Sequence, residues 1–294
     1  MEAFGARAPE VSSESGDVAY DFLGVVGSAG VAWVSGTALN AYLNCNQGFR
    51  APNLQETTVL GDTGNFYELP NPDLGPERSD TFELGAKFDW TGVIRLQPAV
   101  WVSLLSNRIT RETHTINGQS VVDGKAVRRR VNRDSAYFYG VDLSFETAAW
   151  NGASLFGSAS WVDGAIGSAE QRDDFESGPL HGLLGHRQNY ENPRRLPPAT
   201  ATAGLRYEPT RAWYLSMYMV SAATQNKLGP DDLSDLRICE VDKGLLAADV
   251  GEECGGTAGW TTLNAKAGYR YENMAIDVAA LNLTDRRYHR HGSG

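Results

Sequence analysis

Hydrophobic and polar residues alternate with a period of two in several separate stretches of the chain. Between Thr81 and Trp90 the apolar side chains fall on one face of an extended segment and the polar side chains on the other. The same division recurs in residues 137–149, 201–208 and 263–272. Successive side chains of a β-strand point to opposite faces, so this pattern predicts strands with one apolar and one polar face.

The connections between the predicted strands alternate between short and long. Short turns are expected near Val34–Thr37, Trp90–Gly92, Ala149–Gly152, Pro209–Ala212 and Glu272–Met274, and long connections at 50–76, 106–134, 164–196 and 222–259. We count about ten strands, from one within 18–33 to one at 275–283. No apolar run reaches the length of about 18 residues that a transmembrane helix needs. The rhythm is typical of an outer-membrane β-barrel.

Tryptophan supports this assignment. Four of the seven tryptophans, Trp33, Trp90, Trp150 and Trp213, lie beside predicted short turns, where a barrel carries an aromatic girdle at the membrane interface. The alternative is that these aromatic residues fill the core of a soluble β-sandwich. Pro98 interrupts the strand expected from residue 94 to 104 and predicts a bulge or a weakened strand pair, because proline lacks the backbone N–H donor.

Two proline-containing boxes follow the first predicted hairpin. They are Gly48–Leu54 and Asn71–Glu77, and proline fixes the backbone direction in both. The second box runs into Glu77–Gly85, and Asn282–Tyr288 stands near the end of the chain. In this order the motifs resemble the C-terminal half of a TonB-dependent outer-membrane receptor, over about residues 18–294.

The resemblance implies an all-β fold, a partial antiparallel transmembrane β-barrel with short periplasmic turns and long extracellular loops. About ten of an expected 22 strands would be present. The whole chain, 1–294, would form one partial barrel domain, without the plug domain, the first half of the barrel and the final strand. Residues 2–7 lack the features of a secretory signal, so we expect the N-terminus of an exported protein to lie further upstream.

The function implied is that of an outer-membrane receptor that imports a ferric siderophore or a similar scarce nutrient. Its partners would be an iron chelate, its own plug domain, the TonB energy-coupling complex, and membrane lipid and lipopolysaccharide. The alternatives are a haem receptor of the same family, a passive porin-like channel, and a secreted all-β adhesin or binding module. Similar boxes in haem receptors enclose a histidine ligand, whereas residues 53–70 contain no histidine and offer only Tyr67.

Charge and motifs exclude other classes. The net charge of −10 argues against nucleic-acid binding, which needs basic clusters. The sequence contains no nucleophile elbow, zinc-protease helix or phosphate loop, so we expect neither an enzyme nor a cofactor.

Candidate ligand-binding residues concentrate in the long connections. These candidates are Phe49, Arg50, Asn53, Tyr67, Arg128, Arg129, Arg130, His181, His186 and Tyr190. The arginine triplet would attract an anionic chelate or lipopolysaccharide phosphates, or would be a solvated loop edge. The two histidines with Tyr190 are expected to be exposed polar residues rather than a metal or haem site, because their spacing specifies no geometry.

The polar residues at alternate positions of the predicted strands are expected to face the lumen. By resemblance these residues would meet the absent plug: Glu83, Lys87, Asp142, Glu146, Arg206, Lys266 and Arg270. Of the three cysteines, Cys45 occupies one of the alternating apolar positions of its strand and is expected to face lipid. Cys239 and Cys254 share one long connection, and we expect a disulfide between them in an oxidising compartment.

Overall fold

The computed structural model describes residues 24–36, 38–64, 66–167, 190–233, 235–239 and 254–291. Their strands form a single sheet of 14 strands, with ten antiparallel strands along the main path. In order these are β1 (Ser28–Ser35), β2 (Leu39–Arg50), β5 (Glu77–Trp90), β6 (Ile94–Thr113), β8 (Lys125–Thr147), β9 (Ala153–Gly167), β11 (Thr200–Thr210), β12 (Trp213–Ala222), β13 (Trp260–Tyr271) and β14 (Met274–Ala280). The main path thus contains the ten strands that the sequence predicts.

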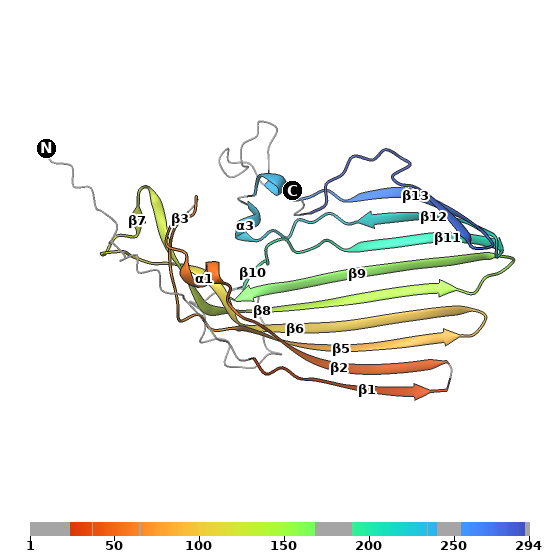
Figure 1. Cartoon of the computed structure of the whole chain (residues 1–294), viewed down its shortest axis with the longest axis horizontal. Coiled ribbons are helices and arrows are strands. Elements are labelled where there is room, and N and C mark those ends of the chain that lie inside the picture. Colours follow the sequence, from red (N-terminus) through yellow and green to blue (C-terminus); the bar gives the residue numbers. More distant parts are fainter. Residues whose placement is uncertain are drawn as a thin grey trace.

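The remaining elements are short and belong to the long connections. They are α1 (Leu54–Thr58), β3 (Gly61–Asp62), β4 (Tyr67–Leu69), β7 (Val121–Val122), β10 (Tyr190–Glu191), α3 (Pro230–Leu233) and α4 (Leu236–Cys239). Figure 1 shows them at one end of the sheet, which we call the long-loop end, with the tight turns at the other, the short-turn end. None of the described helices is long and apolar enough to cross a lipid bilayer.

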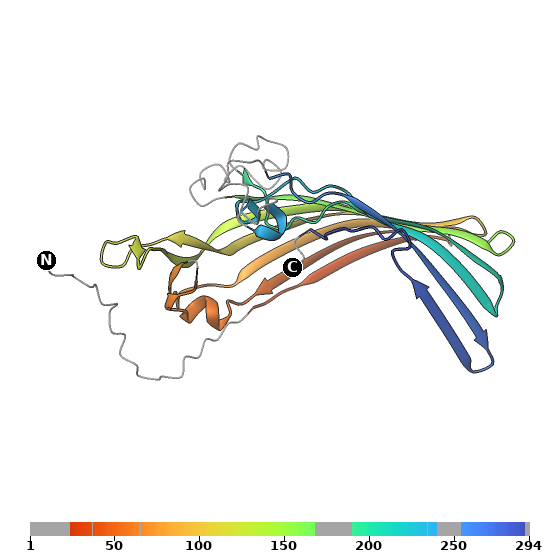
Figure 2. The same ribbon diagram turned by 90° about the horizontal axis from the view of Figure 1, so that it is seen from above.

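The sheet is curved and open. Within the described residues, β1 pairs with β2 alone and β14 with β13 alone. Seen from above, the β13–β14 hairpin bends away from the strands that precede it (Figure 2). Two edges with unpaired backbone groups therefore remain, as expected for part of a larger barrel.

Tight turns close every hairpin at the short-turn end. Gly36, Gly92, Asn151 and Glu272 have φ values of 62°, 77°, 51° and 50° in these turns. Glycine and asparagine tolerate this left-handed conformation, which explains their place here. All five predicted short turns are confirmed.

The two faces of the sheet differ in polarity. Exposed apolar side chains such as Leu84, Val141, Leu205 and Met217 share one face, which we call the outward face. Trp33, Trp90, Trp150 and Trp213 are all exposed at the short-turn end, at 58, 69, 78 and 40 %. The ring of Trp213 packs edge-on against Tyr207, 5.7 Å between centroids. An exposed apolar face bordered by aromatic residues is the surface that lipid requires.

Two details of the sequence prediction need correction. The expected long connection 106–134 is mostly an extended hairpin, because β6 continues to Thr113 and β8 begins at Lys125. At Pro98 the β5–β6 pairing is interrupted between Gly85↔Ala99 and Phe88↔Leu96 without any change of register. The weakened pair is therefore confirmed and the bulge is not found there.

The long connection 222–259 is described in part. It contains α3 and α4, and a disulfide joins Cys239 at the end of α4 to Cys254, with their Cα atoms 5.2 Å apart. Cys45 is free and half-buried in β2. The expected cysteine pairing is thus present in the structure.

Candidate functional site: the long-loop end

The first box ends β2 and begins α1. The backbone N–H of Glu56 donates to Asn53 Oδ1 at 2.9 Å, and the backbone N–H of Asn53 donates to Glu56 Oε2 at 2.9 Å. This reciprocal capping box satisfies two backbone donors at the helix start. A five-residue helix is unstable by itself, so α1 depends on this cap and on what it packs against.

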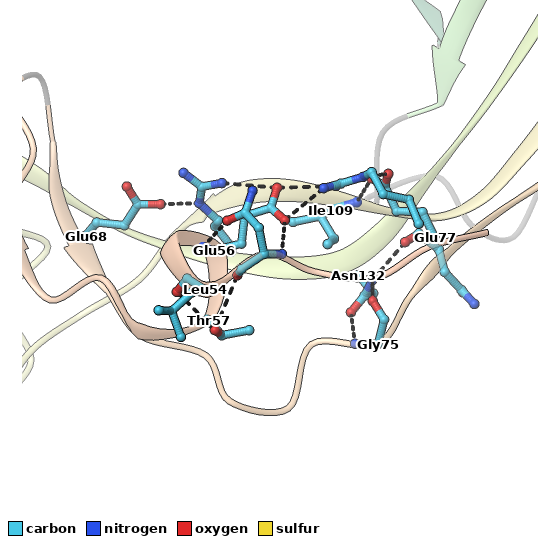
Figure 3. Close-up of polar contacts among 12 residues, drawn as sticks. Leu54, Glu56, Thr57, Glu68, Gly75, Glu77, Ile109 and Asn132 are labelled. Atoms are coloured by element: carbon cyan, nitrogen blue, oxygen red, sulfur yellow. Dashed lines mark hydrogen bonds and ion pairs between the residues drawn. The ribbon is translucent and has the colours of Figure 1, made fainter. Parts of the chain in front are cut away.

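Arg50 joins the first box to the second. Its Nε donates to Glu77 Oε2 at 2.5 Å and its Nη1 to Glu56 Oε2 at 2.9 Å. The other oxygen of Glu77 accepts the backbone N–H of Ile109 at 2.8 Å, as drawn in Figure 3. One arginine therefore connects the end of β2, helix α1 and the start of β5, and Glu77 extends the connection to β6.

Arg130 on β8 holds the same loop from the other side. Its Nε donates to Glu68 Oε1, and its Nη1 lies 3.3 Å from Glu56 Oε1. Glu68 also accepts from Arg111 Nε at 3.3 Å, although its side chain is only 3 % exposed. We call the six residues Arg50, Glu56, Glu68, Glu77, Arg111 and Arg130 the loop charge network. Its three arginines and three glutamates balance, which is the condition for burying charge.

The electrostatics of the network favour ionised carboxylates. Burial alone would raise the pKa of Glu56, but hydrogen bonds from Arg50 and from the Asn53 backbone, with the charge of Arg130, hold this pKa below its usual value. Burial likewise opposes ionisation of Glu68, and Arg130 and Arg111 outweigh it and lower the pKa of Glu68. Both groups therefore remain charged at neutral pH.

The second box docks on β8 through amides. Asn71 Nδ2 donates to the Arg130 carbonyl at 2.7 Å. The backbone N–H of Gly75 donates to Asn132 Oδ1 at 2.7 Å, and Asn132 Nδ2 donates to the Gly75 carbonyl at 2.8 Å. Beneath these contacts Thr57, Leu74 and Val127 are at most 2 % exposed. The loop 50–76 is therefore a packed unit with its own small core.

These contacts bear on the predicted ligand residues. Arg50, Asn53 and Arg130 all bond to other parts of the protein, and Arg129 Nη2 donates to Asn71 Oδ1 at 2.9 Å. Arg128 Nη1 donates to Thr113 Oγ1 at 2.9 Å, with its guanidinium 5.6 Å from the Phe66 ring centre. Their contacts give most of these residues a place in the architecture, and ligand binding by them stays a prediction.

The remaining candidates are separate from the loop charge network. Phe49 is 38 % exposed near the end of β2, and Tyr67 is half-buried in β4, where its backbone pairs with Val127 of β8. His181 and His186 lie outside the described residues, and Tyr190 begins β10. Among the residues that the structure describes, no group of three His, Cys, Asp or Glu side chains is placed to hold a metal ion.

The glutamates and Asn132 were not predicted from the sequence to be binding partners of the boxes. Glu56 follows Asn53 by three residues, which is the capping-box spacing and was readable from the sequence. Glu68 and Arg130 are 62 residues apart, and no local pattern links them.

The seven charged residues expected in the lumen all lie on the face opposite the outward face, which we call the inner face. Aromatic rings lie among them. Tyr42 Oη donates to Glu83 Oε1 at 2.7 Å and Trp101 Nε1 to Asp142 Oδ2 at 2.9 Å. A Cβ atom on Gly85 would clash with the Tyr42 ring, and one on Gly140 would lie 2.6 Å from the Trp101 ring. Glycine is therefore needed beneath each ring.

Comparison with known families decides the identity of this architecture. Residues 3–283 match the family described as TonB dependent receptor-like, beta-barrel. The chain belongs to this family. A comparison with curated protein sequences gave no significant match.

Solved structures show the same fold. The chain is similar to the copper transporter OprC, with 16 % identity, a TM-score of 0.61, and coverage of 90 % of this chain and 34 % of that one. The siderophore receptor PirA from Acinetobacter baumannii has 14 % identity and a TM-score of 0.59, with coverage of 88 % of this chain and 36 % of that one. The FrpB iron transporter from Neisseria meningitidis (F3-3 variant) has 14 % identity and a TM-score of 0.57, with coverage of 90 % of this chain and 35 % of that one. The chain thus spans about a third of the length of these proteins.

As a TonB-dependent receptor barrel, the sheet belongs to the bacterial outer membrane. The family consists of receptors and transporters, in agreement with the expectation that the chain is not an enzyme. In membrane barrels the apolar face contacts lipid and the polar face contacts the interior. The outward face of this TonB-dependent receptor barrel is thus its lipid surface. Contact between the inner face and a plug domain stays a prediction.

Proposed function

We propose that the whole receptor imports a ferric siderophore or a similarly scarce metal chelate across the outer membrane, driven by the TonB complex. The observation that carries this proposal is the family match over residues 3–283. The long-loop end would face outside the cell and the short turns the periplasm, as in other outer-membrane barrels. A plug domain elsewhere in the receptor would contact the charged inner face.

The substrate class rests on two supports. Several proteins with the same fold are named as siderophore or ferric-chelate receptors. Among them are PirA, the ferric yersiniabactin receptor FyuA from Yersinia pestis and the ferric-catecholate receptor Fiu from E. coli. The absence of histidine from residues 53–70 favours a chelate over haem, because Tyr67 is the one iron ligand of the usual haem-binding types between the boxes. In the structure the backbone of Tyr67 is engaged with β8.

Uptake by the full-length receptor tests the proposal. Cells that lack their own siderophore receptors would express it, with and without a functional TonB complex, and iron-55 accumulation would be measured from a panel of ferric siderophores. Copper accumulation would be measured in parallel, since OprC is titled a copper transporter. We expect saturable iron uptake from at least one chelate, abolished without TonB.

Each rival function gives a different result. A porin-like channel would give uptake that is not saturable and does not need TonB. A haem receptor would bind haem with a saturable Soret shift that Tyr67→Phe abolishes, and Tyr42→Phe on the inner face serves as the matched control. A secreted adhesin would remain in the aqueous phase during detergent partitioning. Any of these results would replace the proposed function.

A further inference from the structure

A cluster of aromatic side chains marks the outward face near the long-loop end of β8 and β9. The rings of Tyr137 and Tyr139 stack with centroids 6.3 Å apart, and Tyr139 meets Trp161 edge-on at 5.6 Å. Trp161 is 43 % exposed on this face. Tyrosine and tryptophan collect at the level of lipid headgroups, so this cluster indicates where the outer interface of the membrane crosses the barrel.

A groove of about 510 Å³ begins beside Trp161. Its floor consists of small outward-facing residues on three adjacent strands, Ala159, Ala201 and Ser221, and Val141 and Leu143 of β8 border it. Small side chains on neighbouring strands leave a depression in an otherwise bulky lipid surface. The size and apolar lining of the groove suit a hydrocarbon chain.

The loop after β12 reaches the same face just above the groove. Asp163 lies on the same face of β9 as Trp161 and is 4 % exposed. Lys227 Nζ donates to Asp163 Oδ2, and Tyr139 Oη donates to the same oxygen at 3.3 Å. Lys227 therefore anchors the segment that leads to α3 on the lipid side of the barrel.

Two arginines that precede β11, Arg194 and Arg195, converge with Arg237 of α4 on one carboxylate. Arg237 Nη2, Arg195 Nη2 and Arg194 Nη2 lie 2.6, 3.2 and 3.7 Å from Asp235 Oδ2, which is itself buried. Each arginine side chain is still 39–48 % exposed. Hydrogen bonds from Arg237 first, and then from Arg195, hold the pKa of Asp235 far below its usual range, so it stays charged.

We infer that the groove and the arginine cluster together bind one lipid of the outer leaflet, with an acyl chain in the groove and a headgroup phosphate on Arg195 and Arg237. Four extended residues, Leu196 to Ala199, separate Arg195 from the first strand residue that borders the groove. The Cα atoms of Arg195 and Thr200 are therefore at most about 18 Å apart, a distance that a lipid spans between headgroup and upper chain. Guanidinium groups match phosphate geometry with paired hydrogen bonds.

This inference rests on membership of the barrel family and not on the imported substrate. It also differs from the prediction for Arg128–Arg130, which lie on the extended part of β8 beyond the aromatic cluster. A lipid held here would tie the loop of α3 and α4 to the membrane surface.

Native mass spectrometry of the full-length receptor in detergent tests the site. Bis-phosphorylated lipid A, its dephosphorylated form and inorganic phosphate would each be titrated into the wild type. The same titrations would use the double variant Arg195→Gln/Arg237→Gln and Ala201→Leu, which fills the groove. Matched controls are Arg95→Gln at the short-turn end and Ala267→Leu elsewhere on the outward face. Heat-modifiable migration in gels would show that each variant folds.

We expect phosphorylated lipid to bind at least about tenfold more weakly to the double variant, because two charge-assisted contacts are lost. Ala201→Leu should weaken both lipid forms, and the controls should match the wild type. Inorganic phosphate should not compete at concentrations that match the lipid. Equal binding by the wild type and both site variants, or equal affinity for phosphorylated and dephosphorylated lipid, would overturn the inference.

Discussion

The two ends of the sheet are built by different means. At the short-turn end, turns of a few residues close each hairpin, with glycine or asparagine at most positions of positive φ, and the ion pair Arg95–Asp89 is largely exposed. At the long-loop end, charges from six elements meet in the partly buried loop charge network. Local backbone rules thus suffice at one end, whereas the other depends on partners far apart in the chain.

The largest expected effect comes from removing the most buried carboxylate of the loop charge network, that of Glu68. Glu68→Ala leaves Arg130 without its closest partner in a site where Arg130 is 19 % exposed. Breaking such a pair costs about 3 to 5 kcal/mol. Hydrogen exchange in the full-length receptor should show loss of protection across residues 50–76.

The matched control is Asp89→Ala, which breaks an exposed pair at the short-turn end. Its expected cost is below about 1 kcal/mol, because solvent screens exposed charges. Equal effects of the two substitutions would remove the distinction between the ends.

Loss of the disulfide should have the next largest effect. Cys239 and Cys254 close a loop over a sequence separation of 15, which constrains the unfolded segment by about 3 kcal/mol in the chain-entropy model. Cys239→Ser/Cys254→Ser should raise protease cleavage in 222–259 and leave the short turns unchanged. In the unreduced wild type, thiol counting after denaturation should find Cys45 alone. Three reactive thiols would contradict the pairing.

Acid should loosen the long-loop end before the short-turn end. The pKa values of Glu56 and Glu68 are lowered in the folded loop, so their contribution to stability is complete above the usual glutamate pKa of about 4.3. It is lost as the pH falls through the lowered values. We expect a smaller effect than that of Glu68→Ala, because a protonated carboxyl group keeps hydrogen bonds. Exchange protection of 50–76 that is constant from pH 7 to pH 3 would contradict this.

The smallest effect concerns the helix cap. Asn53→Ala removes one reciprocal bond of the capping box and should destabilise α1 by about 1 kcal/mol. At the short-turn end Asn151→Gly should be close to neutral, since φ is 51° there and glycine accepts it. Local hydrogen-exchange rates would be measured in both variants and compared. A larger effect at Asn151 would reverse the expected order.

The sequence predicted what alternation and turn chemistry encode. The ten main strands, the five short turns and the placement of Glu83, Lys87 and Asp142 on the polar face required only a period of two. The hairpin within 106–134 was missed because β6 and β8 extend there beyond the apolar surface of the sheet. Both faces of the strands become polar, so the alternation of apolar and polar residues is lost. A register shift between Leu105 and Ile109 lies at this boundary.

The candidate site was less predictable for a related reason. The boxes were recognisable, but apart from Glu56 their partners lie far along the chain: Glu77 is 27 residues from Arg50, and Asn132 is 57 residues from Gly75. A single sequence shows which residues carry charge and does not show which charges meet. The same limit explains why the arginine triplet suggested a ligand site, although Arg130 binds glutamates of the loop.

Accessibility from outside the cell shows directly whether the long-loop end faces the cell exterior and the short-turn end the periplasm. Gln55→Cys on exposed α1 and Asn151→Cys in a short turn would be introduced singly into the full-length receptor and treated with a membrane-impermeant maleimide. We expect labelling of residue 55 in intact cells and of residue 151 only after the outer membrane is permeabilised. Surface protease should likewise cut within 164–196 or 222–259. Labelling of residue 151 but not of residue 55 in intact cells would show that the orientation is the reverse.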